Sequence, residues 1–355
     1  MRILYDTYWW TSGPVSGRVV VREILRAWRE EFPEDEFVLG VRPRDRAAIA
    51  REFPGCKQVR IFGRPHGIAT ATQYGFHARR HRVDVAYTQN FAPPGVWSAI
   101  FVHDVMYQTN PEWFTRPERA YYWLIPFLAR GADLVVTSSQ NEARRIRDNN
   151  PRLRRVEAVG LSVATALVEA TPQMPEVAHG LDGFLLTVGR LNVRKNLGVA
   201  LLGALESGRL TPQRPLIVVG GEDGRSADVP AAAVRAIDEG LIRFVPRVSD
   251  GELAWLYSHA DLFVCLALDE GFGLPPVEAA HFGTPVVVSD IPVFRENLGD
   301  LATYTDETDV TAVSNVIRVT SSDRIDASGA FVSWRDCAQN LRSAIWNAYF
   351  SSNPK

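Results

Sequence analysis

Residues 267–280 read Ala-Leu-Asp-Glu-Gly-Phe-Gly-Leu-Pro-Pro-Val-Glu-Ala-Ala. Asp261 to Leu266, just before them, form a short apolar run typical of a buried strand, and Pro275 to Phe282 are typical of a helix that begins with prolines. Where a glycine-rich turn joins a strand to a helix in a parallel sheet, its backbone N–H groups can approach an anion. Glu270 and Glu278 flank this turn. The pattern therefore predicts a ligand with phosphate and hydroxyl groups, such as a sugar nucleotide.

A second segment lies upstream, where residues 188–196 read Val-Gly-Arg-Leu-Asn-Val-Arg-Lys-Asn. It follows the apolar run from Phe184 to Val188, which is typical of a strand. The guanidinium of Arg190 can bind two phosphate oxygens, and Lys195 supplies a compact charge. Either residue alone fits an ordinary surface loop, but lysine is rare in this chain, which favours a functional Lys195. Arg194, between the two, is expected to be exposed.

Together the two segments resemble the E-x7-E and G-R-x4-K-N motifs of the family 4 retaining glycosyltransferases. The resemblance covers most of the C-terminal half closely and the N-terminal half loosely. It implies the GT-B fold, an α/β architecture in which two Rossmann-like parallel-sheet domains face a cleft. In that fold the donor nucleotide belongs with the second domain and the acceptor with the first.

The resemblance also implies roles for the residues of the two motifs. Arg190 and Lys195 would hold the diphosphate and offset the charge that develops on it. Glu278 would accept the ribose hydroxyls, and Glu270 would face the donor sugar in a positioning and electrostatic role, not as a nucleophile. Further donor contacts are implied for the N–H groups of Gly271, Phe272, Gly273 and Leu274, and, beside the nucleobase, for Arg247 and Val248.

In the first domain the resemblance points to a histidine and two glycines. His103 follows a strand and would reach the donor sugar, although a structural histidine is the alternative. Gly13 and Gly17 would approach the diphosphate, but their spacing departs from the adjacent glycines of the family, and a plain turn is the alternative. Trp9 and Trp10 could line an acceptor groove, touch a membrane or simply pack in the core.

Strand and helix patterns alternate through most of the chain, which predicts parallel sheets covered on both faces. Residues 1–165 form the expected N-terminal acceptor-binding domain. Residues 166–332 form the expected donor-nucleotide-binding domain, and 333–355 an amphipathic C-terminal helix that crosses back to the first domain. Ser249 and Glu252 form a predicted capping box at the start of a helix.

The composition limits the class of protein. The 355 residues have a formal net charge of −2, contain three distant cysteines and include no apolar run long enough to span a membrane. We therefore expect a cytoplasmic protein. Residues 1–165 carry 24 basic and 17 acidic residues, a balance of +7. This excess fits either ordinary surface or peripheral contact with the inner face of a membrane.

The expected activity is metal-independent transfer of a hexose from a nucleotide diphosphate sugar to a glycan or glycolipid hydroxyl, in surface polysaccharide synthesis. GDP-mannose is the first expected donor, and no cofactor, metal or nucleic acid is expected. No D-x-D-type metal motif occurs at a strand end, so Arg190 and Lys195 would replace the metal. Alternatives are a UDP-glucose or UDP-galactose transferase and a non-catalytic sugar-nucleotide-binding subunit. A dinucleotide-dependent oxidoreductase is disfavoured because no G-x-G-x-x-G fingerprint follows the first strand.

Overall fold

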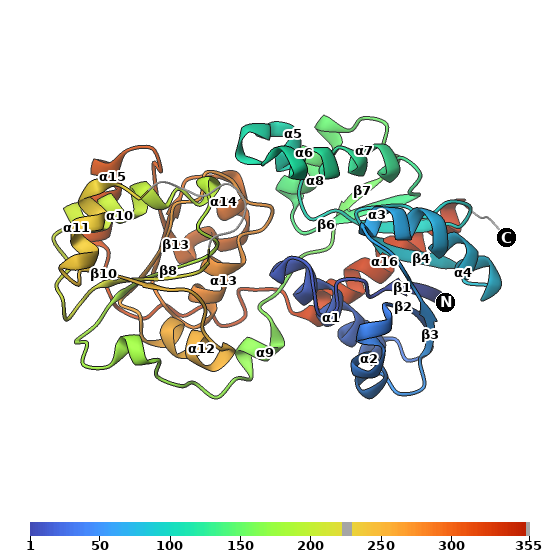
Figure 1. Cartoon of the computed structure of the whole chain (residues 1–355), viewed down its shortest axis with the longest axis horizontal. Coiled ribbons are helices and arrows are strands. Elements are labelled where there is room, and N and C mark those ends of the chain that lie inside the picture. Colours follow the sequence, from blue (N-terminus) through green and yellow to red (C-terminus); the bar gives the residue numbers. More distant parts are fainter. Residues whose placement is uncertain (222–228, 353–355) are drawn as a thin grey trace. The chain divides into compact units, whose positions relative to one another are not determined.

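The computed structural model describes residues 1–221 and 229–352, which form two compact units (Figure 1). Unit 1 comprises Met1–Thr109, Arg116–Ser162 and the C-terminal segment from Val332. Unit 2 comprises Asn110–Thr115 and Val163–Phe331. A short segment that the sequence places in the first domain thus clusters with the second unit.

Unit 1 is built on a seven-stranded parallel sheet in the order β3-β2-β1-β4-β5-β6-β7. Its strands are mostly buried apolar runs, as expected where helices cover both faces of a parallel sheet. They are β1 (Arg2–Asp6), β2 (Glu36–Val41), β3 (Lys57–Arg60), β4 (Val85–Gln89), β5 (Ser98–Phe101), β6 (Leu134–Thr137) and β7 (Val156–Ala158).

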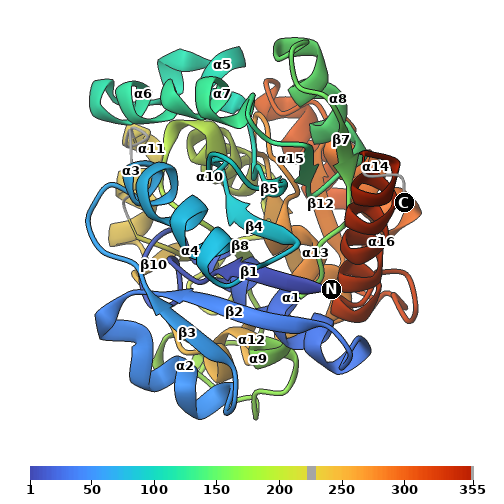
Figure 2. The same ribbon diagram turned by 90° about the vertical axis from the view of Figure 1, so that its right-hand side faces the viewer.

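The helices of unit 1 come from both ends of the chain. They are α1 (Val15–Glu31), α2 (Arg46–Glu52), α3 (His66–Ala69), α4 (Gly75–Arg80), α5 (Met106–Thr109), α6 (Arg116–Tyr122), α7 (Leu124–Ala129), α8 (Gln140–Asn149) and α16 (Trp334–Ser352). Helix α16 packs along α1 (Figure 2). Asp35 accepts hydrogen bonds there from Arg342 Nε at 2.7 Å and from the Met1 amine at 2.6 Å.

Unit 2 has a six-stranded parallel sheet in the order β10-β9-β8-β11-β12-β13. Its strands are β8 (Leu185–Val188), β9 (Leu216–Val219), β10 (Ile242–Val245), β11 (Leu262–Cys265), β12 (Val286–Ser289) and β13 (Ala302–Thr305). Its helices are α9 (Thr165–Val168), α10 (Leu197–Glu206), α11 (Ala231–Asp238), α12 (Asp250–His259), α13 (Leu274–His281), α14 (Pro292–Leu298) and α15 (Val310–Val319). Helices α10, α11 and α15 share one buried apolar core with the sheet, and α9, α12, α13 and α14 share another.

Several details differ from the sequence prediction. The sequence pattern predicts a strand at 59–62, and the structure places this strand two residues earlier, as β3. The sequence pattern also predicts one helix at 68–82, but in the structure a π-helical turn at Thr70–Tyr74 separates α3 from α4. The capping box is confirmed: the Ser249 hydroxyl accepts from the Glu252 N–H, and the Glu252 carboxylate accepts from the Ser249 N–H at 2.8 Å.

Candidate functional site

In unit 2 the two predicted motifs follow the two central strands, β8 and β11, which pair directly with each other. From β8 the strand order runs outward through β9 and β10, and from β11 it runs the other way through β12 and β13. The connections after β8 and β11 therefore leave toward opposite sides. Open α/β sheets bind ligands at this kind of switch point, beyond the carboxyl ends of the strands.

Lys195 and Glu270 meet at this edge. Lys195 Nζ lies 2.6 Å from Glu270 Oε1, and their side chains are only 13% and 10% exposed. Burial raises the pKa of Glu270, but the positive charges of Lys195, Arg194 and Arg190 more than offset this and leave the pKa below its usual value. Glu270 is therefore an ionised, charge-compensated carboxylate.

Glycines and one backbone bond build this arrangement. A Cβ at Gly220 would lie 1.7 Å from the carbonyl oxygen of Gly189, and a Cβ at Gly189 would lie 3.1 Å from Lys195 Cε. Both glycines thus make room, the first for a strand end and the second for the lysine side chain. The Leu268 N–H donates to the Arg194 carbonyl at 2.8 Å and links the two motif loops.

The prediction that Arg194 is exposed is wrong. The residue is only partly exposed, because its loop is bonded to the loop after β11, and its charge acts on Glu270. Arg190, which follows β8, is also partly exposed and contributes to the same positive field. The sequence segment 188–196 thus directs more positive charge toward Glu270 than its two motif residues alone would suggest.

Glu278 lies one turn into α13, on the other side of the glycine turn. Its Oε2 accepts a hydrogen bond from the Tyr257 hydroxyl of α12 at 2.8 Å. Burial raises the pKa of Glu278 to about 6. The two carboxylates of the motif therefore differ, since Glu270 is held ionised and Glu278 titrates close to neutrality.

The turn between them requires a left-handed residue at Gly273, which has a φ of +83°. A Cβ at Gly273 would also lie 2.4 Å from Phe294 Cε1. Asn297 Nδ2 donates to the Phe272 carbonyl at 2.7 Å and pins the turn from α14. Because Pro275 and Pro276 lack N–H groups, any backbone donation to a ligand here must come from residues 271–274 or from beyond the prolines.

The two residues predicted beside a nucleobase follow β10, the edge strand of the same sheet. Arg247 is exposed. Val248 is partly buried and packs against the core that α12 and α13 share with the sheet. Both lie just before α12, the helix that carries Tyr257.

His103 lies two residues after β5 in unit 1. Its Nε2 is 3.1 Å from Gln89 Oε1, and its ring lies 5.5 Å from that of Trp9. Burial lowers the pKa of His103 to about 4, so the imidazole is neutral at pH 7. Asp104 accepts a hydrogen bond from the Met106 N–H at 3.3 Å, so it orders the loop, while Gln89 orients the histidine.

Gly13 and Gly17 have a neighbour that the sequence did not predict. A Cβ at Gly13 would lie 2.9 Å from Trp9 Cδ1, and one at Gly17 would lie 2.7 Å from Trp9 Cε3. The two glycines therefore leave room for the Trp9 indole. Trp9 is 9% exposed and Trp10 is 2% exposed. Of the three predicted roles, which were an acceptor groove, membrane contact and packing in the core, the structure supports packing.

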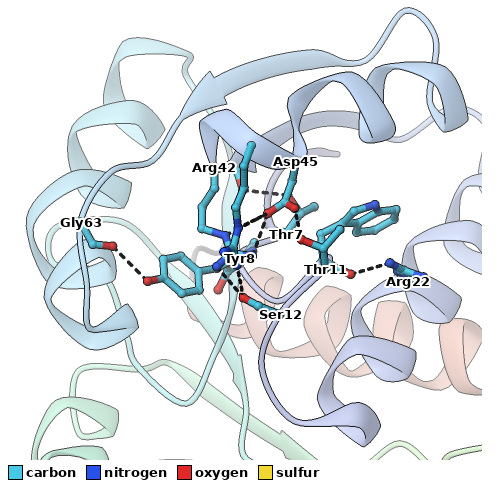
Figure 3. Close-up of polar contacts among 12 residues, drawn as sticks. Thr7, Tyr8, Thr11, Ser12, Arg22, Arg42, Asp45 and Gly63 are labelled. Atoms are coloured by element: carbon cyan, nitrogen blue, oxygen red, sulfur yellow. Dashed lines mark hydrogen bonds and ion pairs between the residues drawn. The ribbon is translucent and has the colours of Figure 1, made fainter.

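A polar network holds the loop that carries Trp9 (Figure 3). The buried Arg42 donates from Nε to Asp45 at 2.9 Å and from Nη1 to the Ser12 hydroxyl at 2.7 Å. Its guanidinium also lies 4.6 Å from the centre of the Tyr8 ring, and the Thr11 hydroxyl donates to Asp45. The network fixes the connection between β1 and α1.

Asp6, at the end of β1, forms a second buried cluster in unit 1. Its Oδ2 lies 2.7 Å from His66 Nε2, and the Tyr74 hydroxyl and the Tyr8 N–H also donate to the carboxylate. Burial by itself raises the pKa of Asp6. The interaction with His66 and these hydrogen bonds lower it by a larger amount, so the pKa lies below its usual value. No local pattern in the sequence points to this pair, because Asp6 and His66 are 60 positions apart.

Neither a metal-ion site nor a membrane-spanning helix is found among the described residues. Over 1–221 and 229–352, no group of three or more His, Cys, Asp or Glu side chains is arranged to hold a metal ion. No helix in this part of the chain combines the length and the apolar character needed to cross a membrane.

Comparison with known families gives a match in unit 2. Residues 175–328 match the family described as "Glycosyl transferases group 1". The chain is 30% identical over 250 residues to an O-antigen chain mannosyltransferase B of Escherichia coli, covering 66% of this chain and 62% of that protein. It is 39% identical over 103 residues to the O-antigen chain mannosyltransferase RfbU of Salmonella typhimurium, covering 29% of each. The chain thus spans less than two thirds of the length of these relatives.

Solved structures resemble the chain over nearly its whole length. A sucrose-phosphate synthase from Thermosynechococcus elongatus has a TM-score of 0.61 at 18% identity, covering 99% of this chain and 96% of that one. WaaG, a glycosyltransferase involved in lipopolysaccharide biosynthesis, has a TM-score of 0.59 at 15% identity, covering 100% of both. The two parallel α/β sheets and these neighbours show the GT-B fold.

Proposed function

Because residues 175–328 form a glycosyl transferases group 1 domain, we propose that the whole chain is a retaining hexosyltransferase. It moves a hexose from a nucleotide diphosphate sugar, with GDP-mannose as the first candidate, to a hydroxyl of a glycan or lipid-linked glycan. Unit 2 binds the donor and unit 1 the acceptor. The reaction needs no metal ion.

The observation that carries this proposal is the contact between Lys195 and Glu270, which joins the two predicted motifs at one sheet edge. Leaving-group departure places negative charge on a diphosphate. Lys195 and Arg190 supply positive charge at the carboxyl ends of β8 and β11, where ligands of such sheets bind. Glu270, already ionised, accepts hydrogen bonds from the donor sugar's hydroxyls and stabilises positive charge that develops at the reacting carbon.

The proton of the acceptor hydroxyl goes to the departing phosphate in a front-face displacement, so neither Glu270 nor Glu278 acts as a nucleophile. Glu278 binds the ribose, the N–H groups of residues 271–274 contact the donor, and Arg247 and Val248 lie beside the base. His103 is neutral, so it offers a hydrogen bond to the donor sugar without adding charge. That Gly13 and Gly17 approach the diphosphate stays a prediction, although in the structure the two glycines make room for the Trp9 indole.

The choice of mannose and of a polysaccharide acceptor rests on the relatives, two of which are named O-antigen chain mannosyltransferases. We place the reaction in surface polysaccharide synthesis, on the cytoplasmic side of the inner membrane. Peripheral membrane contact through the basic N-terminal domain belongs to the same proposal, because residues 1–165 contain 24 basic and 17 acidic residues.

The test measures release of free nucleotide from GDP-mannose, UDP-glucose and UDP-galactose, with and without a lipid-linked glycan extract. We expect release from one donor, insensitive to a chelator, and its loss in Lys195→Ala. Lys57→Ala, which removes an exposed lysine of β3, is the matched control. Binding of a sugar nucleotide without turnover under any acceptor condition would instead identify a non-catalytic subunit. Activity restored to a chelated enzyme by added magnesium would contradict the metal-free reaction.

A further inference from the structure

The hydroxyl of Tyr257 is buried inside unit 2 and is directed at a residue of the proposed donor site. Tyr257 is 0% exposed, and its hydroxyl donates to Glu278 Oε2 at 2.8 Å. A buried tyrosine hydroxyl needs a polar partner, whereas an apolar side chain in the same space would need none. The contact therefore couples α12 to the carboxylate on α13.

Tyr257 is held in place from several directions. Its ring stacks on Phe282, with centroids 5.9 Å apart and an angle of 14° between the rings, and it lies 5.8 Å from the ring of Phe263. Its carbonyl accepts hydrogen bonds from the Thr284 hydroxyl and from Arg324 at 3.3 Å. The hydroxyl is thus presented from a rigid backbone, so it fixes the direction of the carboxylate.

An ionised carboxylate has two oxygens with about four lone-pair positions. Tyr257 takes one of these positions on Oε2, which leaves Oε1 and the remaining lone pair of Oε2 for a ligand. Two neighbouring hydroxyls of a ribose match this arrangement, because each donates one hydrogen bond to one carboxylate oxygen. A 2′-deoxyribose offers only one such hydroxyl.

We propose that Tyr257 is a positioning residue that orients Glu278 toward the 2′- and 3′-hydroxyls of the donor nucleotide, so that the site selects ribonucleoside diphosphates over their deoxy counterparts. This inference rests on the proposed function and adds to it a nucleotide class and a residue that acts through Glu278. Tyr257 itself does not touch the ligand.

The charges around Glu278 give the inference a pH signature. Burial raises the pKa of Glu278 to about 6, while the Tyr257 hydrogen bond and Lys195 lower it and Asp250 raises it. Cys265 of β11 also acts electrostatically on Tyr257 and raises the pKa of its hydroxyl. Binding two hydroxyls requires the carboxylate, so affinity is full above the pKa and is lost as pH falls through it. Removing the Tyr257 hydroxyl raises the pKa, so the loss begins at a higher pH.

The experiment measures dissociation constants by calorimetry for GDP and UDP and for their 2′,3′-dideoxy counterparts, between pH 5 and pH 8. Wild-type protein should bind the ribonucleotide about 10- to 100-fold more tightly, as expected for hydrogen bonds to a charged group. Tyr257→Phe should weaken the ribonucleotide about 3- to 10-fold at pH 7 and leave the dideoxynucleotide unchanged. Tyr304→Phe, which removes another tyrosine hydroxyl of unit 2, is the control and should match wild type.

Equal weakening of both nucleotides in Tyr257→Phe, or no weakening of either, would overturn the inference. Binding of no nucleotide by wild-type protein would overturn the proposed function and the inference with it, which separates the two failures. If Tyr257→Phe does not fold, as judged by circular dichroism, the wild-type preference decides. It should decline below about pH 6 and be absent in Glu278→Gln, whereas a preference that is constant with pH contradicts the inference.

Discussion

Lys195 Nζ lies 2.6 Å from Glu270 Oε1, so the lysine of the first motif is paired with the first carboxylate of the second. Each residue is the other's charge compensation in the structure. A diphosphate that binds Lys195 must compete with Glu270 for the ammonium. Donor binding and the charge state of Glu270 are therefore linked.

Lys195→Met should lower turnover at least 100-fold, because it removes positive charge from the proposed leaving group. It should also destabilise the fold by about 3 kcal/mol, because Glu270 is left buried without its closest partner. The double variant Lys195→Met/Glu270→Gln should recover most of the stability and none of the activity. Chemical denaturation and a donor-turnover assay measure the two effects. Full activity in Lys195→Met would exclude a diphosphate role.

Gly220→Ala should be among the most destabilising single substitutions in unit 2. Its Cβ would lie 1.7 Å from the Gly189 carbonyl oxygen. The nearest atoms all belong to the Gly189 backbone, so no flexible side chain can move aside. We expect a loss above about 3 kcal/mol. Gly221→Ala is the matched control, since among the described residues its Cβ would meet only the Pro246 carbonyl oxygen, at 3.8 Å. Similar melting temperatures for the two variants would contradict this prediction.

His103 should make the protein less stable as the pH falls. Burial lowers its pKa to about 4, so between that value and about 6.5 the unfolded chain binds a proton that the native state does not. Stability should fall by about 2 kcal/mol between pH 7 and pH 5 from this group alone. His103→Gln should remove this part of the pH dependence. NMR titration gives the pKa directly, and a value near 6.5 would refute the prediction.

Asp6→Asn should cost about 1–3 kcal/mol, because it replaces a buried carboxylate that accepts hydrogen bonds from the Tyr74 hydroxyl and the Tyr8 N–H and contacts His66. The pKa of Asp6 is lowered in the native state, so its contribution is present above the unfolded pKa and is lost as pH falls through the native one. The stability difference between wild type and variant should thus narrow in acid. Asp290→Asn, at an exposed pair with Arg295, should change stability little and serves as the control. A difference that persists unchanged in acid would show that the effect is not electrostatic.

Much of the fold followed from the sequence, because strands of parallel sheets are buried on both faces and appear as short apolar runs. Helix α15 could not be predicted in this way, because Val310–Val319 is rich in β-branched residues, which also suit strands. Its helix depends on Asp309, whose side chain caps the Thr311 and Ala312 N–H groups, and on packing against α10. Such tertiary contacts have no local sequence signal.

The candidate site was predictable in its residues but not in its contacts. Motif spacing placed Lys195 and Glu270 at strand ends, but their pairing depends on β8 and β11 being neighbours, which spacing does not reveal. No motif pointed to Tyr257, because it lies 21 positions from Glu278 in the sequence and outside both motifs. The glycines in the first loop were ambiguous for another reason. A missing Cβ can admit a ligand or a side chain, and here Trp9 occupies the space beside Gly13 and Gly17.

The packing of α16 on α1 has a consequence for how the protein is made. Unit 1 is interrupted in sequence by the segment Val163–Phe331. On the ribosome, Asp35 and the side of α1 that α16 later covers emerge long before Arg342. The strands β8–β13, in contrast, emerge in one continuous stretch of the chain. Unit 2 can therefore complete its core during translation, whereas unit 1 acquires α16 only after all of Val163–Phe331 has been synthesised. A chaperone that shields α1 until then would protect the nascent chain from aggregation.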